Sequence, residues 1–228
     1  MKFYQALRSR IVVSRVFTVS LLLATFLLLA VVLVSLYSDI PVSNFTRDPL
    51  AIAGGRPFYG LLSNIGVVMW SSSMALCFFS YSLLKAGNAS RKVLYFVVSG
   101  GALSLILLLD DLFMLHEHFY PRYLGYGEKA VFLTYGLLLL IYVVVFFDRI
   151  FEKSGSYLCC FVFFFALSVL VDRLPESFLP MHHIFEDGSK LLGITSWLGF
   201  HSSACYNEVQ SHFGLTSPAK STDRLELD

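Results

Sequence analysis

One short segment of the sequence, LDDLFMLHEH, holds the residue types best suited to chemistry. Two adjacent carboxylates, Asp110 and Asp111, are followed by His116, Glu117 and His118. Helical spacing would place Asp110 and Glu117 on one stripe, and Asp111 and His118 on the next. Because carboxylates and imidazoles bind Zn, Fe and Mn, the segment indicates a metal site, a group of proton carriers, or a solvated helix end with paired charges.

A second segment, HHIFEDGSK, begins at position 182 and has a similar composition. Its Glu186 and Lys190 are spaced as a favourable i,i+4 pair on a helix. One interpretation is a helix start with acids at its positive end. The other makes His183, Glu186 and Asp187 partners of the first acidic segment, with Lys190 as their counter-charge.

Acids from further segments are expected at the same depth, since Glu128 opens one apolar run and Asp172 ends another. A carboxylate at the edge of the hydrocarbon costs roughly 3 kcal/mol unless it is protonated, paired or ligated, so such residues mark functional sites. The candidate metal ligands are Asp110, Asp111, His116 and Glu186, and the candidate catalytic residues are Glu117, Asp187 and Lys190.

The composition indicates which kind of fold holds these residues in place. Of 228 residues, 56% are hydrophobic and only 14% are charged, whereas soluble domains carry roughly 25% charged residues. A membrane helix needs about 20 apolar residues. The sequence therefore predicts an all-α, polytopic transmembrane helix bundle of about six spans, at residues 16–37, 58–84, 93–111, 130–147, 157–171 and 187–206.

Basic residues indicate the orientation of this bundle. With the N-terminus inside, eleven lysines and arginines lie in cytoplasmic segments and six on the other side, which favours both termini in the cytoplasm. The acidic and histidine-rich segments then lie at the extracytoplasmic helix ends. Residues 1–206 are predicted to form one transmembrane domain, and residues 207–228 a flexible polar tail.

The cysteines and the overall charge exclude some other functions. All four cysteines lie in apolar segments without the spacing of a metal motif or a disulfide framework, so we expect them to be packing residues. The formal charge of +1 gives no reason to expect a nucleic-acid partner.

Two of these segments carry a resemblance to known sequences. LDDLFMLHE at 109–117 and EDGSKLLG at 186–193 resemble the signatures of uncharacterised bacterial multi-pass membrane proteins, which implies the bacterial inner membrane but no activity. The chain is also similar to the alkaline ceramidase and progestin-receptor-like membrane hydrolases, which combine several helices with a zinc site of histidines and an aspartate. The similarity is one of general kind only. The chain lacks their His-xxx-His and Ser-xxx-His patterns, so no catalytic residue is carried over.

Three functions fit the pattern. The first is a metal-dependent membrane enzyme of hydrolase type, with a divalent Zn, Fe or Mn ion, acting on a lipid or amphipathic substrate. The second is a proton- or ion-coupled carrier or sensor that uses the same acids. The third is a non-catalytic subunit or assembly factor whose charges dock a membrane protein partner.

Overall fold

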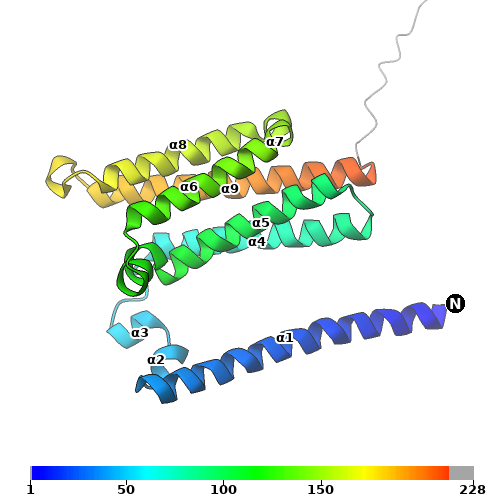
Figure 1. Ribbon diagram of the computed structural model, residues 1–228, viewed down its shortest axis with the longest axis horizontal. Coiled ribbons are helices and arrows are strands. Elements are labelled where there is room, and N and C mark those ends of the chain that lie inside the picture. The colour runs from blue at the N-terminus through cyan, green and yellow to red at the C-terminus, as the bar shows by residue number, and fades with distance from the viewer. Residues whose placement is uncertain (1, 216–228) are drawn as a thin grey trace, which may run out of the picture. The chain divides into compact units, whose positions relative to one another are not determined.

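The computed structural model describes the backbone of residues 2–215 and the side chains of residues 17–215, except Lys153 and Glu176. Every regular element in that range is a helix (Figure 1), which confirms the all-α prediction for the described residues. The chain divides into two units, Met1–Tyr59 and Gly60–Asp228, and each is described by itself.

The first unit consists of α1 (Lys2–Ser38) and two short helices, α2 (Ser43–Thr46) and α3 (Pro49–Ala53). Within Phe17–Ser38 of α1, a stretch of 18 residues has a mean hydropathy of 2.8. Apolar residues occur around the whole circumference of this stretch, as expected of a helix in lipid. Asp48 caps α3 by accepting hydrogen bonds from the backbone N–H groups of Leu50 and Ala51.

The second unit is a bundle with α9 at its centre. Helix α9 packs against α8 and α4, and α4 packs against α5 (Figure 1). Helix α6 lies beside α5 and the π-helix η1. The bounds are α4 Leu61–Ala86, α5 Arg91–Phe113, η1 Leu115–Leu124, α6 Glu128–Val145, α7 Phe147–Lys153, α8 Gly155–Asp172, the 3-10 turn η2 Glu176–Phe178, and α9 His182–Phe213.

Aromatic side chains fill the centre of this bundle. Trp70 of α4 and Trp197 of α9 are buried with their ring centroids 6.0 Å apart, and Phe161 of α8 lies 4.6 Å from Trp197. The indole N–H of Trp197 donates to the Ser104 hydroxyl of α5 at 2.9 Å, so its one polar group is satisfied. These contacts join four helices.

Close helix packing depends on small residues in α5. A Cβ added at Gly100 would collide with the ring of buried His201, and one at Gly101 would lie 3.0 Å from the Cβ of Cys77. His201 Nδ1 lies 3.3 Å from Cys77 Sγ. All four cysteines are free, with Cys77 and Cys205 buried.

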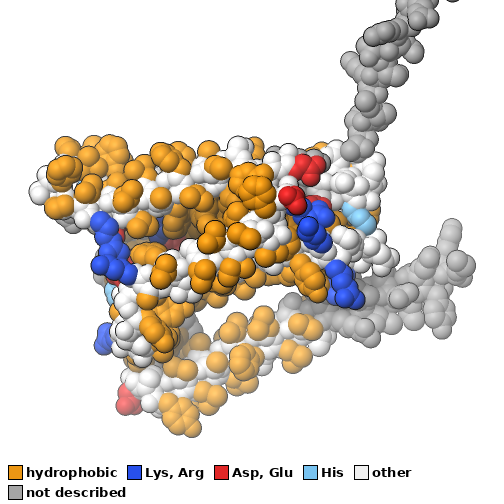
Figure 2. All heavy atoms as spheres, turned by 45° about the horizontal axis from the view of Figure 1, so that its top comes forward, with side chains coloured by type: hydrophobic (Ala, Val, Ile, Leu, Met, Phe, Trp, Pro, Cys, Tyr) orange, Lys and Arg blue, Asp and Glu red, His pale blue; other side chains and the backbone are white. Residues whose placement is uncertain are grey.

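Five helices of the described chain are long and apolar enough to cross a membrane: Phe17–Ser38, Leu61–Ala86, Arg91–Phe113, Glu128–Val145 and Gly155–Asp172. In Figure 2, hydrophobic side chains cover the flanks of the second unit and charged ones gather toward the helix ends. Helix α9, which contains the expected span 187–206, is long enough but more polar. A sixth crossing and the orientation of the termini therefore stay predictions.

The last helix extends beyond the expected start of the tail. A flexible segment was expected from residue 207, but α9 continues to Phe213. Its last turns are held because Glu208 pairs with Arg149 of α7 at 2.7 Å and Val209 packs on the core. His212 Nε2 also lies 2.9 Å from the Gly87 carbonyl oxygen. The remainder of the predicted tail, 216–228, lies outside the described residues.

Candidate functional site

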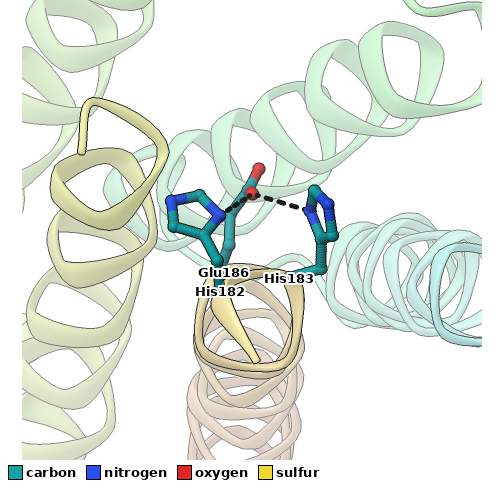
Figure 3. Close-up of side chains that lie close together, drawn as sticks. All are labelled: His182, His183 and Glu186. Atoms are coloured by element: carbon teal, nitrogen blue, oxygen red, sulfur yellow. Dashed lines mark ion pairs between the residues drawn. The ribbon is translucent and has the colours of Figure 1, made fainter. Parts of the chain in front are cut away.

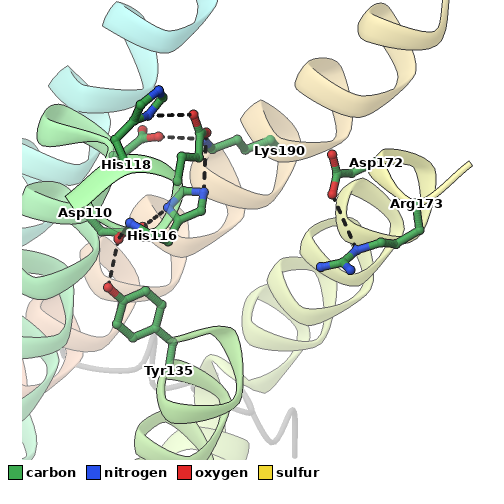
Figure 4. A network of polar contacts seen from close by, with 9 residues as sticks. Asp110, His116, His118, Tyr135, Asp172, Arg173 and Lys190 are labelled. Atoms are coloured by element: carbon green, nitrogen blue, oxygen red, sulfur yellow. Dashed lines mark hydrogen bonds and ion pairs between the residues drawn. The ribbon is translucent and has the colours of Figure 1, made fainter. Parts of the chain in front are cut away.

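The end of helix α5 at Phe113 allows Asp110 and His116 to come together. Met114 adopts a left-handed conformation with φ of 49°, so α5 ends at Phe113 and η1 begins at Leu115. The stripes predicted from the sequence assumed one continuous helix through this segment. The carboxylate of Asp110 accepts three hydrogen bonds: from His116 Nδ1 at 2.6 Å, from the His116 backbone N–H at 3.0 Å, and from the Tyr135 hydroxyl at 2.8 Å (Figure 4).

The charge of His116 depends on this neighbour. Its side chain is 12% exposed, and burial alone would lower the pKa of the imidazole. The hydrogen bond and negative charge of Asp110, with the charge of Glu117 at 3.4 Å from His116 Nε2, outweigh burial and raise the pKa above its usual value. The pair therefore favours the protonated imidazole beside a carboxylate.

Asp111 is held by a different helix. Lys190 of α9 places its Nζ 2.5 Å from Asp111 Oδ1, and the aspartate side chain is 8% exposed. The second carboxylate oxygen, Oδ2, is buried and has no hydrogen-bond partner among the described residues. Of the two interpretations of Lys190, the i,i+4 pair with Glu186 is not the contact that it makes here. Its side chain reaches across to α5, as expected of a counter-charge for the first acidic segment.

Three residues at the start of α9 form a group that could hold a metal ion: His182, His183 and Glu186. Glu186 Oε2 lies 3.6 Å from His182 Nδ1 and 3.7 Å from His183 Nδ1 (Figure 3). His182 is 7% exposed, and its Nε2 lies 2.8 Å from the Val171 carbonyl oxygen. A carbonyl can only accept, so Nε2 donates this hydrogen bond and Nδ1 is the ring nitrogen that faces Glu186.

One cavity of about 770 Å³ contains all of these groups. It lies at the ends of α5, α6, α8 and α9, and the residues that line it include Trp70 and Phe165. All seven candidate residues predicted from the sequence line it, as do Glu128, Asp172, His118, His182, His183 and Tyr135. The structure thus gathers the predicted residues but divides them into an Asp110–His116 group, an Asp111–Lys190 pair and a Glu186 group.

Sequence reasoning missed two members of this site. His182 was not assigned a role, although its spacing to Glu186 is the i,i+4 relation that places two side chains on one helix face. No sequence signal indicates the hydrogen bond that Tyr135 of α6 donates to Asp110 of α5.

The fold and the cavity define a class: a helical protein with five candidate membrane spans and a histidine–carboxylate group able to hold a metal ion. The chain belongs to the family described as Domain of unknown function (DUF8692), whose model matches residues 20–204. The match begins within α1 and includes every cavity residue. No curated protein and no solved structure matches the chain.

Proposed function

We propose that this protein is a metal-dependent membrane enzyme of hydrolase type, acting on a lipid or other amphipathic substrate at the extracytoplasmic helix ends. The observation that carries the proposal is the buried Nδ1 of His182, which has no hydrogen-bond partner among the described residues and faces Glu186. An imidazole held by its other nitrogen on a backbone carbonyl is a common arrangement of a metal ligand.

The spacing of the three ligand atoms supports this assignment. Nitrogen and oxygen ligands bind zinc at about 2.0–2.1 Å, so neighbouring ligands in a tetrahedral site lie about 3.4 Å apart. The separations of 3.6 and 3.7 Å around Glu186 Oε2 are close to that value. Exposed His183 would supply the third ligand, which leaves the side facing the cavity for water or substrate.

The ligand set proposed here differs from the one expected from the sequence. His116 Nδ1 and Asp110 lie at hydrogen-bonding distance, 2.6 Å, which is too short for two ligands of one ion. We therefore assign Asp110, Asp111 and His116 to the cavity wall, where they hold Tyr135 and Lys190. Glu186 remains a ligand.

The chemistry would be the addition of water across a bond of the substrate. A bound divalent ion would acidify a water molecule and polarise the substrate. Glu117 or Asp187, both lining the cavity, would take a proton from water and return it to the leaving group. Lys190 would remain the counter-charge of Asp111.

A carrier or sensor has less support. Transport of ions would require a polar path beyond the cavity, and the side chains below it are the packed aromatics Trp70, Phe161 and Trp197. An assembly factor would need no open ligand position, whereas the His182–Glu186 group offers one.

The test is the metal content of protein purified in mild detergent, measured by elemental mass spectrometry. We expect near-integral Zn, Fe or Mn in the wild type and in Glu117→Gln, and loss of the metal in Glu186→Gln and His182→Gln. Glu117→Gln is a matched control because it removes a carboxylate from the same cavity.

The variants also separate the two ligand sets. Loss of metal in Asp110→Asn with retention in His182→Gln would return the ion to the ligands expected from the sequence and refute the assignment made here. Absence of metal in every sample, even after incubation with each ion, would refute the enzyme proposal and turn attention to proton transport and partner binding.

A further inference from the structure

An apolar groove of about 520 Å³ lies between α5, α6 and α8, with Trp197 of α9 at its base. Its walls are leucine, valine, isoleucine, phenylalanine and small residues such as Gly136 and Ala166. The groove adjoins the polar cavity, because five residues line both: Leu107, Phe132, Tyr135, Phe165 and Val169. A molecule with a polar end and an apolar end could therefore occupy both at once.

The charge of the cavity restricts the polar end of such a molecule. Seven carboxylates line the cavity against one lysine, Lys190. Arg173 pairs with Asp172 at the rim, at 3.6 Å. Even with Arg173, a protonated His116 and one divalent ion counted as positive, the carboxylates remain in excess. An anionic head group would be repelled and a cationic one attracted.

We propose that the cavity and the groove together bind an amphiphile with a hydrocarbon chain and a cationic amine head group. The chain lies in the groove against Trp197, and the ammonium group lies among the cavity carboxylates. This assignment names the substrate class of the proposed enzyme and rests on that function, but binding requires only the carboxylates and the groove, so it can be measured without turnover.

Gly136 allows the groove to be blocked without damage to the core. A Cβ added there would meet no atom within 4 Å, so the side chain of Gly136→Phe would extend into the groove. Ala166→Phe would fill it from α8, on the opposite wall. Leu133→Phe is the matched control, because Leu133 lies on α6 outside the groove and is 75% exposed.

The tryptophans supply the readout. The chain contains two, Trp70 at the cavity and Trp197 at the groove. A bromine atom in contact with an indole quenches its fluorescence. The probes are ω-bromoundecylamine and ω-bromoundecanoate, which share one chain length and carry opposite charges at about pH 8.

In mild detergent we expect saturable quenching by the amine and binding of the carboxylate at least about tenfold weaker. Gly136→Phe and Ala166→Phe should each weaken amine binding about tenfold, the loss expected when two methylenes leave the groove. Leu133→Phe should leave it unchanged. The helix content and metal content of each variant show that it is folded.

Equal quenching of the wild type and both groove variants would refute the chain site, and equal binding of amine and carboxylate would refute the head-group assignment. A change of oligomeric state in the groove variants, with amine binding intact, would assign the groove to a protein partner instead. Failure of the proposed enzyme would look different: no sample would contain metal, yet the amine would still bind.

Discussion

Removal of the Lys190 ammonium group tests the electrostatics of the cavity most directly. Lys190→Met keeps the length of the side chain and the helix propensity of α9 but leaves Asp111 without its counter-charge. The aspartate side chain is 8% exposed, and its Oδ2 already has no hydrogen-bond partner among the described residues. The variant would therefore hold a buried carboxylate with neither oxygen paired.

The size of the effect follows from the burial of the two partners. Breaking a buried ion pair by removing one member costs about 3–5 kcal/mol. Because the Lys190 side chain is 32% exposed, solvent screens part of the interaction, and we expect the lower end of that range, about 3 kcal/mol. For a chain of this length the unfolding temperature should fall by about 6–12 °C.

The assay is thermal unfolding in mild detergent, followed by tryptophan fluorescence. Lys129→Met is the control, since it removes an exposed lysine from the start of α6 and should change stability by less than about 0.5 kcal/mol. The double variant Asp111→Asn/Lys190→Met removes both charges and should recover at least half of the loss.

Two results would refute this reasoning. An unfolding temperature of Lys190→Met within about 2 °C of the wild type would mean that Asp111 is neutral or otherwise compensated. A double variant as unstable as Lys190→Met would mean that lysine acts through packing of its aliphatic stem and not through its charge.

Two further predictions concern packing and pH. Gly100→Ala should destabilise the bundle by about 1–3 kcal/mol, because its methyl group would collide with His201; Gly188→Ala meets open space and should be neutral or stabilising in the same melting assay. Since the pKa of His116 is raised, its pair with Asp110 contributes stability that is full below about pH 6.5 and is lost as pH rises through the raised pKa. His116→Gln should remove this decline above about pH 6.5, and an unchanged decline would assign it to other groups.

The helices could be predicted from the sequence because apolar runs alternate with charged or glycine-containing segments. Each expected span lies within or overlaps one helix of the structure. Helix α9 was harder, since its length depends on tertiary contacts: the pair of Glu208 with Arg149 continues the helix beyond residue 206. A local pattern of polar residues does not show that a partner on α7 will stabilise them.

That the acids lie at the same end of the bundle could also be predicted, and it accounts for their meeting in one cavity. Their pairing could be predicted only in part: the sequence offered Lys190 as a counter-charge of the Asp110 and Asp111 segment, but not which of these acids it contacts. Which basic residue each acid contacts depends on the left-handed turn at Met114. A bulky apolar residue adopts this conformation rarely, and no sequence pattern predicts it here. Lys190 has a favourable acid one turn away, yet it contacts Asp111 of another helix.

The bond from His182 Nε2 to the Val171 carbonyl oxygen has a consequence for mutational tolerance. When a histidine is oriented by a carboxylate side chain, one substitution removes the acceptor. Here the acceptor is main chain, so any residue at position 171 that keeps α8 helical preserves the same tautomer of His182. A substitution that fits the buried position of Val171 therefore keeps this acceptor, whereas a shift of the α8 backbone relative to α9 would be sufficient to turn the imidazole away.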